Sequence, residues 1–235
     1  MKKFTLIELL IVVAIIGILV SMLIPSLAKA REVTKRAVCS SNLSQISKAY
    51  QLYATQNSNF LISAETREYT NHAPAWVKHS AWNFEQNIQK SPLWPYINSV
   101  EVFQCSNEMR DDNLTNGNYL RSYAVNVFLN GRGWVNGIID NIAKADYPTS
   151  TITFIDEEDP RGYNMNSWVA GYNNKWVDWP ANNHGNKTMP LSFLDGHNTM
   201  YHFRNSTTSQ INWFFDNTSY EDRLEFMRLT NPNID

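Results

Sequence analysis

The chain has 235 residues, of which 43% are hydrophobic, 18% charged and 13% aromatic, so it is neither a disordered chain nor a low-complexity repeat protein. Residues 1–36 hold six Lys/Arg and two Glu, and the rest of the chain carries 14 basic against 20 acidic residues. Because this acidic body lacks the basic surface that phosphate binding needs, we expect no nucleic acid partner.

A long apolar run occupies the N-terminal region. Between Phe4 and Ala28 the only charged residue is Glu8. These 25 residues would span roughly 37 Å as a helix, more than the ~30 Å hydrocarbon core of a bilayer. A cleaved signal peptide is the alternative, because two lysines precede the run. The run is long for a signal peptide, lacks a small-x-small site and continues into a helical pattern, so we expect a transmembrane helix at residues 4–28 that is retained.

The apolar run continues into a predicted amphipathic helix, residues 29–57. Apolar side chains recur there at intervals of three and four, at Leu43, Ile46, Tyr50 and Tyr53. Val33 and Ala37 are expected to extend this stripe toward the N-terminus. The pattern predicts one helix of about fifty residues, from near Phe4 to near Thr55, whose second half packs one face on a domain.

Glu8 and Pro25 are unusual residues to find inside this predicted helix. An unpaired carboxylate near the start of a membrane span costs about 2–3 kcal/mol. Either Glu8 reaches the headgroups beside Lys2 and Lys3, or it pairs with a positive group in an assembly, such as the amino terminus of a neighbouring copy. Pro25 has no backbone N–H to donate, so we expect it to bend the helix or loosen one turn.

The segment Phe4-Thr5-Leu6-Ile7-Glu8-Leu9-Leu10 resembles the class III signal of type IV pilins and type II secretion pseudopilins. The resemblance implies that a prepilin peptidase removes the basic leader, residues 1–3, by cutting between Lys3 and Phe4, and that the new amino group of Phe4 is methylated. It also implies that Glu8 pairs with that amine in a growing filament, and that Pro25 corresponds to the family's helix-loosening proline. Lys3 is a departure, because the family usually has Gly before the cut.

The same resemblance implies a location and partners. The protein would cross the bacterial inner membrane once, with its globular domain on the periplasmic or extracellular side. Its partners would be the prepilin peptidase and other pilin or pseudopilin subunits, in a type IV pilus or in the protein transport machinery of a type II secretion system.

The remainder, residues 58–235, is predicted to be one globular domain with long loops. Short apolar bursts between Asn, Gly, Pro and Ser predict strands within Tyr119–Leu129 and at Thr151–Ile155. Leu191–Leu194 and Met200–Phe203 should form a hairpin across Asp195-Gly196-His197-Asn198. A short terminal helix is predicted within residues 213–229. The fold class is therefore α+β, with a long N-terminal helix packed on an antiparallel sheet.

The C-terminal half also resembles a known group. The segments CSSNLSQISKAYQLYA, VFQC, RSYAVN and HGNKTMPLSFLDGH are similar to a large set of bacterial pilin-like proteins. In that set the anchor is joined to a C-terminal His, about nine residues, then Asp-Gly. Here ten residues separate His184 from Asp195, which we interpret as a one-residue loop insertion.

Cys39 and Cys105 are the two cysteines of the chain. An even pair in an exported domain predicts one disulfide, between the helix and the residue after the strand-like segment 100–104. Two buried thiols are the alternative. No CxxC or Cys/His spacing typical of a metal site occurs.

Four carboxylates follow the predicted strand at Thr151–Ile155, namely Asp156, Glu157, Glu158 and Asp159. They are a candidate Ca²⁺ site, since Ca²⁺ takes six to eight oxygen ligands, and Ca²⁺ is the one cofactor that the sequence suggests. The EF-hand pattern is absent and Arg161 is close enough to neutralise part of the charge. A solvated acidic loop is therefore the favoured interpretation.

His184, Asp195 and His197 are candidates for a metal site or an acid/base pair. Structural roles are favoured, because their spacing is that of no zinc motif and Asp-Gly is what a tight turn needs. The sequence also lacks G-x-S-x-G, a P-loop and a dinucleotide fingerprint. We therefore expect no catalytic residue, and a protein that is not an enzyme.

Trp168, Trp176 and Trp179 lie among tyrosines and asparagines, where exposed rings could stack on a carbohydrate. Filling the core of a loop-rich domain is the favoured alternative. With His184 and Asp195 they define a candidate ligand face, residues 156–195.

Three functional hypotheses follow. The first is a structural subunit of a type IV pilus-like or pseudopilus filament. The second is a membrane-tethered binding module, for carbohydrate among other ligands, that uses a pilin-type anchor. The third and least favoured is a tethered hydrolase that uses His184, Asp195 and the acidic run. Glu8 separates the first two, because a simple tether gains nothing from a carboxylate in its membrane segment.

Overall fold

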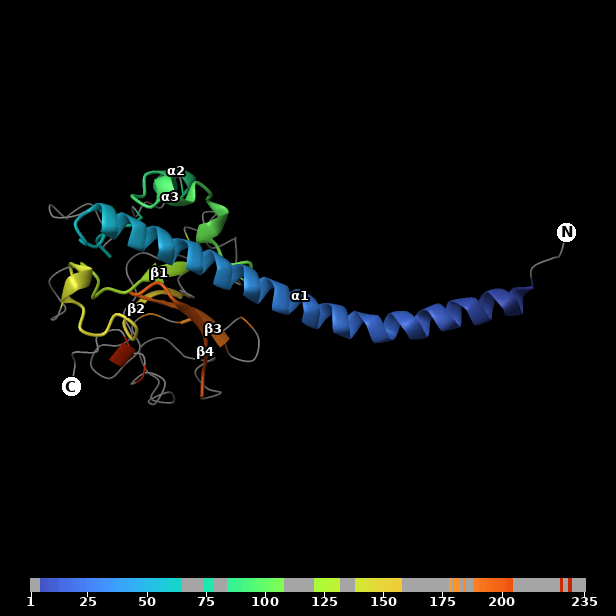
Figure 1. The fold of residues 1–235 in the computed structure, drawn as a ribbon. Coiled ribbons are helices and arrows are strands. Elements are labelled where there is room, and N and C mark those ends of the chain that lie inside the picture. Colours follow the sequence, from blue (N-terminus) through green and yellow to red (C-terminus); the bar gives the residue numbers. More distant parts are fainter. Residues whose placement is uncertain are drawn as a thin grey trace.

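The computed structural model describes residues 5–64, 74–77, 84–107, 121–131, 138–157, 178, 180–181, 184, 188–204, 225 and 228–229. Its helices are α1 (Leu6–Gln56), α2 (Phe84–Gln89) and α3 (Trp94–Ile97), with 3-10 turns η1 (Glu101–Phe103) and η2 (Ile142–Lys144). Its strands are β1 (Tyr123–Val125), β2 (Ile152–Asp156), β3 (Thr188–Phe193) and β4 (Asn198–His202). The predicted α+β class is confirmed: a long N-terminal helix lies on an antiparallel sheet (Figure 1).

Helix α1 is continuous over 51 residues, as the pattern predicted. It runs through Pro25 without a break and curves gently along its length (Figure 1). It ends at Asn57, whose backbone N–H donates to the carbonyls of Tyr53 and Ala54. None of residues 5–38 is buried, so the first half of α1 extends away from the domain (Figure 1).

The second half of α1 buries one face. Its buried residues are Cys39, Leu43, Ile46, Ser47, Ala49, Tyr50 and Ala54. The predicted stripe is confirmed from Leu43 to Tyr50, but its extension to Val33 and Ala37 is wrong, because both are exposed. The domain contacts α1 before Cys39, for example through Ser106 Oγ, which donates to the Lys35 carbonyl (3.1 Å), but it covers side chains of α1 completely only from Cys39 onward.

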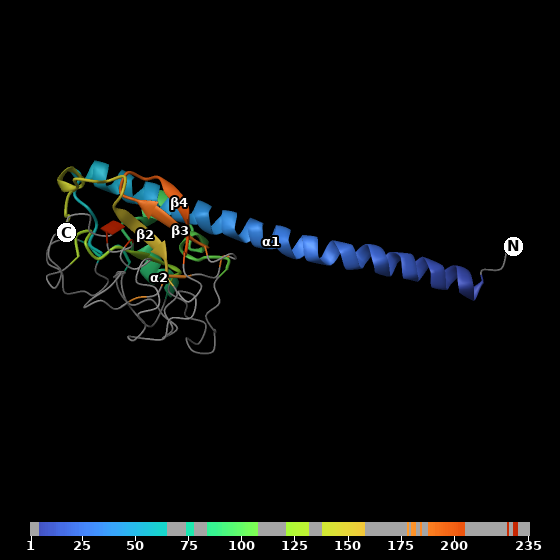
Figure 2. The ribbon, with the colours of Figure 1, turned by 90° about the horizontal axis from the view of Figure 1, so that it is seen from below.

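The four strands form an antiparallel sheet in the order β1-β2-β3-β4. Helix α1 contacts β2, β3 and β4, and Figure 2 shows β3 and β4 beside it. Hydrogen bonds connect the helix to this layer. Gln51 Nε2 donates to the Leu194 carbonyl (2.8 Å), Tyr123 Oη to the Cys39 carbonyl (3.0 Å), and Asn198 Nδ2 to the carbonyl (3.1 Å) and Oγ (2.9 Å) of Ser40.

The residues of β1, β2 and β3 are buried on both faces of the sheet, whereas every residue of β4 is exposed or half-buried. Tyr123, Val125 and Phe154 face the cluster that includes the buried residues of α1. The other face carries a second apolar cluster, which contains Ala124, Ile152, Ile155, Met189, Leu191, Phe193 and Phe203. This arrangement explains why all five residues of β2 are buried, including the polar Thr153 and Asp156.

The local predictions had mixed outcomes. The strand at Thr151–Ile155 and the hairpin of Leu191–Leu194 with Met200–Phe203 are confirmed, as β2 and as β3 with β4. The strand-like interpretation of residues 100–104 is wrong, because η1 occupies that position. Within 213–229, Glu225, Arg228 and Leu229 are helical, and the remaining positions lie outside the described residues.

Candidate functional site

The first feature is the N-terminal end of α1, where Thr5 and Glu8 form a capping box. The Glu8 carboxylate accepts from the backbone N–H of Thr5 (2.8 Å) and from Thr5 Oγ1 (2.8 Å), while the Glu8 N–H donates to Thr5 Oγ1 (3.3 Å). This arrangement satisfies donors that a helix start leaves without partners. The Thr-x-x-Glu spacing was visible in the sequence and could have revealed this structural role for Glu8.

Both bonds from Thr5 reach the same carboxylate oxygen, Oε2. The other oxygen, Oε1, has no partner among the residues that the structure describes. Glu8 can therefore cap its own helix and still accept from an outside donor. Lys3 and Phe4, the expected processing residues, lie outside the described part of the chain.

The second feature is the apolar surface of the first half of α1. Large apolar side chains from Leu6 to Leu27 are exposed, and Leu6 itself is 78% exposed. Among the described residues, α1 is the helix long and apolar enough to cross a membrane, by length and composition.

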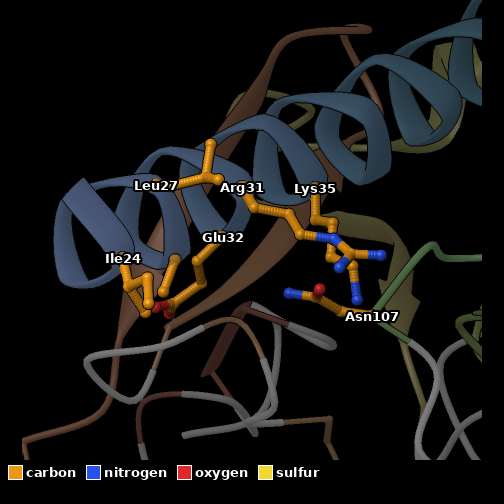
Figure 3. Close-up of a pocket in the computed structure, with 7 residues that line it drawn as sticks. Ile24, Leu27, Arg31, Glu32, Lys35 and Asn107 are labelled. Atoms are coloured by element: carbon orange, nitrogen blue, oxygen red, sulfur yellow. The ribbon is translucent and has the colours of Figure 1, made fainter. Parts of the chain in front are cut away.

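A pocket of about 700 Å³ lies where α1 leaves the domain (Figure 3). It is lined by Ile24, Leu27, Ala28, Arg31, Glu32, Lys35 and Asn107. Arg31 and Lys35 extend from α1 toward Asn107 of the domain (Figure 3). Cationic side chains therefore follow the apolar surface directly along the helix.

The third feature is a buried group of side chains around Cys39 and Cys105. The structure joins the two cysteines in a disulfide, with Cα atoms 5.0 Å apart. His184 Nε2 lies 3.1 Å from Cys105 Sγ and 3.1 Å from Asp156 Oδ2. The other ring nitrogen of His184, Nδ1, has no partner within the described ranges. All four residues are buried, and we call them the Cys–Asp–His cluster.

The acidic run has a different setting from the one expected. Asp156 is the last residue of β2 and is 1% exposed, and Glu157 is 3% exposed. The interpretation of these two residues as a solvated acidic loop is wrong, because both lie in the interior of the domain. Glu158 and Asp159 lie outside the described residues, so a Ca²⁺ site formed by all four carboxylates stays a prediction.

The structure divides the predicted His184, Asp195 and His197 group into two environments. His184 belongs to the buried cluster, whereas Asp195 and His197 pair in the β3–β4 turn, with Oδ1 and Nδ1 2.6 Å apart. The Phe193 and His197 rings stack at 4.3 Å between centroids. The Asp195–His197 pair is thus part of a turn at the surface, as the tight-turn interpretation predicted.

Two further residues of the interior escaped the sequence-based predictions. Arg121 is 1% exposed, and its guanidinium carbon lies 4.7 Å from the centroid of the buried Trp76 ring, a cation–π geometry. Nothing in the local pattern around Arg121 indicates burial. Trp168, Trp176 and Trp179 lie outside the described residues, so the carbohydrate hypothesis gains no structural support.

One curated protein provides a link to a known function. Over 59 residues the chain is 44% identical to the type IV wide pilus major component PilA4 of Thermus thermophilus. The matched region covers 25% of this chain and 45% of that protein, so the chain spans less than half of the relative's length. No profile of a known protein family and no solved structure matches the chain. The chain is thus a partial homologue of a type IV pilin and has the long-helix-on-sheet architecture expected for one.

Proposed function

We propose that this protein is a structural subunit of a type IV pilus-like or type II secretion pseudopilus filament. The main supporting observation is that the apolar first half of α1 is exposed and extends away from a folded domain (Figure 1). The partial similarity to a pilus component supports the same class of function. The role is assembly, so it needs no catalytic residue.

The physical argument begins with the exposed apolar surface. Apolar area costs roughly 25 cal/mol for each Å² that stays in water, so a helix that is apolar all round must be covered. Before assembly, lipid covers it, with the domain held outside the inner membrane. In the filament, the same surface packs on the α1 helices of other subunits. A segment that suits both environments lets a subunit move from membrane to filament.

The charges near the two ends of the apolar run suit this arrangement. Lys29, Arg31, Lys35 and Arg36 follow the run, where their long side chains can reach the polar headgroup region. At the other end, a prepilin peptidase would cut between Lys3 and Phe4 and methylate the Phe4 amine. The Glu8 carboxylate, with Oε1 available beside the capping bonds, would then accept from the Phe4 amine of a neighbouring copy.

The test compares two substitutions that break the same capping box. Glu8→Ala removes the carboxylate and the two bonds that it accepts, whereas Thr5→Ala removes the hydroxyl that caps the Glu8 N–H and keeps the carboxylate. Both variants should remain in the membrane fraction, because the apolar run is intact. Glu8→Ala should fall by more than ~10-fold in sheared filament fractions, since it leaves the neighbour's amine without a counter-charge in an apolar environment.

Thr5→Ala should enter filaments at close to the parent level. Equal amounts of parent and Glu8→Ala protein in the filament fraction would contradict the pairing. Equal losses for Thr5→Ala and Glu8→Ala would show that the cap, and not the charge, is what assembly needs. Mass spectrometry of the mature amino terminus would check the cut before Phe4.

A further inference from the structure

The Cys–Asp–His cluster brings together four metal-ligating atoms from distant parts of the chain. Cys39 comes from α1, Cys105 from the segment after η1, Asp156 from the end of β2, and His184 from the segment before β3. Their ligating atoms all lie within 4.8 Å of one another, and all four residues are buried. No local motif predicts this convergence, because Cys39 and Cys105 alone are separated by 66 positions.

The donor set matches the preferences of zinc. Zn²⁺ binds four protein ligands tetrahedrally in structural sites, with Zn–S of about 2.3 Å and Zn–N or Zn–O of about 2.0–2.2 Å. Those bond lengths place neighbouring ligand atoms about 3.3–3.8 Å apart. The Nε2 atom of His184 already lies 3.1 Å from both Cys105 Sγ and Asp156 Oδ2. Small side-chain movements would therefore complete the tetrahedron once the two sulfurs are no longer bonded.

The surroundings of Cys105 also suit a thiolate. The backbone N–H of Asn107 points at Cys105 Sγ, with 3.4 Å between nitrogen and sulfur. Such a donor stabilises negative charge on a ligating sulfur more than it stabilises a neutral disulfide sulfur.

We propose that the dithiol form of the protein binds one Zn²⁺ through Cys39, Cys105, Asp156 and His184. The disulfide and the zinc ion are then alternative cross-links between α1 and the sheet. A dithiol reductant converts the disulfide by supplying two electrons and two protons, which gives two thiols and the oxidised reductant. Zinc binding then releases the two thiol protons to solvent and leaves two thiolate ligands.

This assignment predicts a structural rather than a catalytic site. Four protein ligands fill the tetrahedron, so no position stays open for water or substrate. Before oxidation, the zinc site would hold Cys39, the first buried residue of α1, against the rest of the domain. This proposal does not depend on assembly of the protein into a filament. A chain newly made in a reducing compartment could thus fold around zinc. A protein disulfide or another thiol oxidant that takes up two electrons would later convert the two thiolates into the disulfide and release the zinc ion.

The experiment uses the full chain in detergent micelles, without oxygen and with a phosphine reductant. Zinc alone is added, and bound metal is counted after gel filtration. Cobalt(II) is the spectroscopic probe, because tetrahedral coordination by thiolates gives strong visible bands and thiolate-to-cobalt charge transfer. We expect one metal ion per chain in the reduced protein and none in the disulfide form.

His184→Ala should weaken zinc binding by at least ~100-fold and remove the tetrahedral cobalt spectrum. His197→Ala is the matched control, because His197 also contacts an aspartate but lies at the surface turn. Folding of each variant is checked by circular dichroism in the disulfide form. Absence of metal from the reduced parent, equal binding by the disulfide form, or an unchanged cobalt spectrum in His184→Ala would each overturn the proposal.

Discussion

At the scale of single residues, the interior of the domain contains several ionisable side chains that the sequence pattern does not mark as buried. Arg121, Asp156, Glu157 and His184 are all at most 3% exposed. Buried ionisable groups are costly unless their neighbours stabilise them, so substitutions that remove one partner should be more damaging than substitutions at the surface. This cost makes the buried polar groups strict constraints on how α1, β2 and the loops pack together.

Tyr50 gives a measurable consequence of such burial. Its hydroxyl donates to the Ile62 carbonyl (3.2 Å), and its ring packs on Phe154 edge to face with centroids 5.3 Å apart. Burial raises the pKa of Tyr50, and the neighbouring Tyr53 adds to the rise. The folded state therefore accepts only the neutral phenol, whereas the unfolded chain loses this proton near pH 10.

The sign of the pH dependence follows from that raised pKa. The contribution of neutral Tyr50 to stability is complete below pH 10 and is lost as the pH rises further toward the folded-state pKa. At pH 10.5 the expected loss is about 0.8 kcal/mol relative to pH 8. Urea unfolding in micelles at the two pH values should show a smaller loss in Tyr50→Phe than in the parent, because Tyr53, whose pKa burial also raises, stays in the variant. Tyr147→Phe, at an exposed tyrosine, should behave like the parent, and an unchanged pH dependence in Tyr50→Phe would contradict the argument.

At the scale of elements, the turn of the β3–β4 hairpin contacts α1 directly. Gln51 of α1 donates to the Leu194 carbonyl at the start of the turn. The turn itself needs Gly196, which has φ of +92°. A Cβ at this position would also lie 2.7 Å from the amide atoms of Gln51. Turn geometry and helix docking therefore depend on the same glycine.

Gly196→Ala should destabilise the domain by about 1–2 kcal/mol, because the new methyl group meets a strained φ and the Gln51 side chain. The measurement is the free energy of unfolding in urea. Gly17→Ala is the matched control, since nothing lies within 4 Å of a Cβ there and alanine favours a helix. Equal stability of Gly196→Ala and the parent would show that the turn adapts without cost.

At the scale of the whole molecule, α1 has two halves with different surroundings. The first buried residue is Cys39, and everything described before it is exposed or half-buried. The domain therefore draws no core residue from the apolar run. We therefore expect the domain to fold independently of membrane insertion of the apolar run.

A truncation test follows from that separation. Removal of residues 1–28 should leave a soluble, monomeric domain whose Tm is within a few degrees of the full chain in micelles, because no buried contact is lost. Removal of residues 1–44 should abolish cooperative unfolding, since it takes away Cys39 and Leu43. Aggregation or loss of the thermal transition after the shorter truncation would show that the apolar half also supports the domain.

The sequence by itself determined the features that depend on local periodicity. Sequence patterns predicted the extent of α1, its amphipathic second half, the β2 strand and the β3–β4 hairpin. These elements are predictable because backbone hydrogen bonds within a helix or across a tight turn involve residues close in the chain. The apolar first half of α1 could be predicted as well, since length and hydropathy alone identify a run that can span a membrane.

Only the tertiary structure decided which polar residues are buried and where the helix meets the domain. Asp156 and Glu157 have a sequence typical of a surface loop, yet they are interior because β2 lies between two apolar clusters. Likewise, the buried stripe of α1 begins at Cys39 because that is where the domain first covers the helix completely, not because the pattern changes there. The Cys–Asp–His cluster joins four separate segments, and local propensity holds no information about contacts over such distances in the chain.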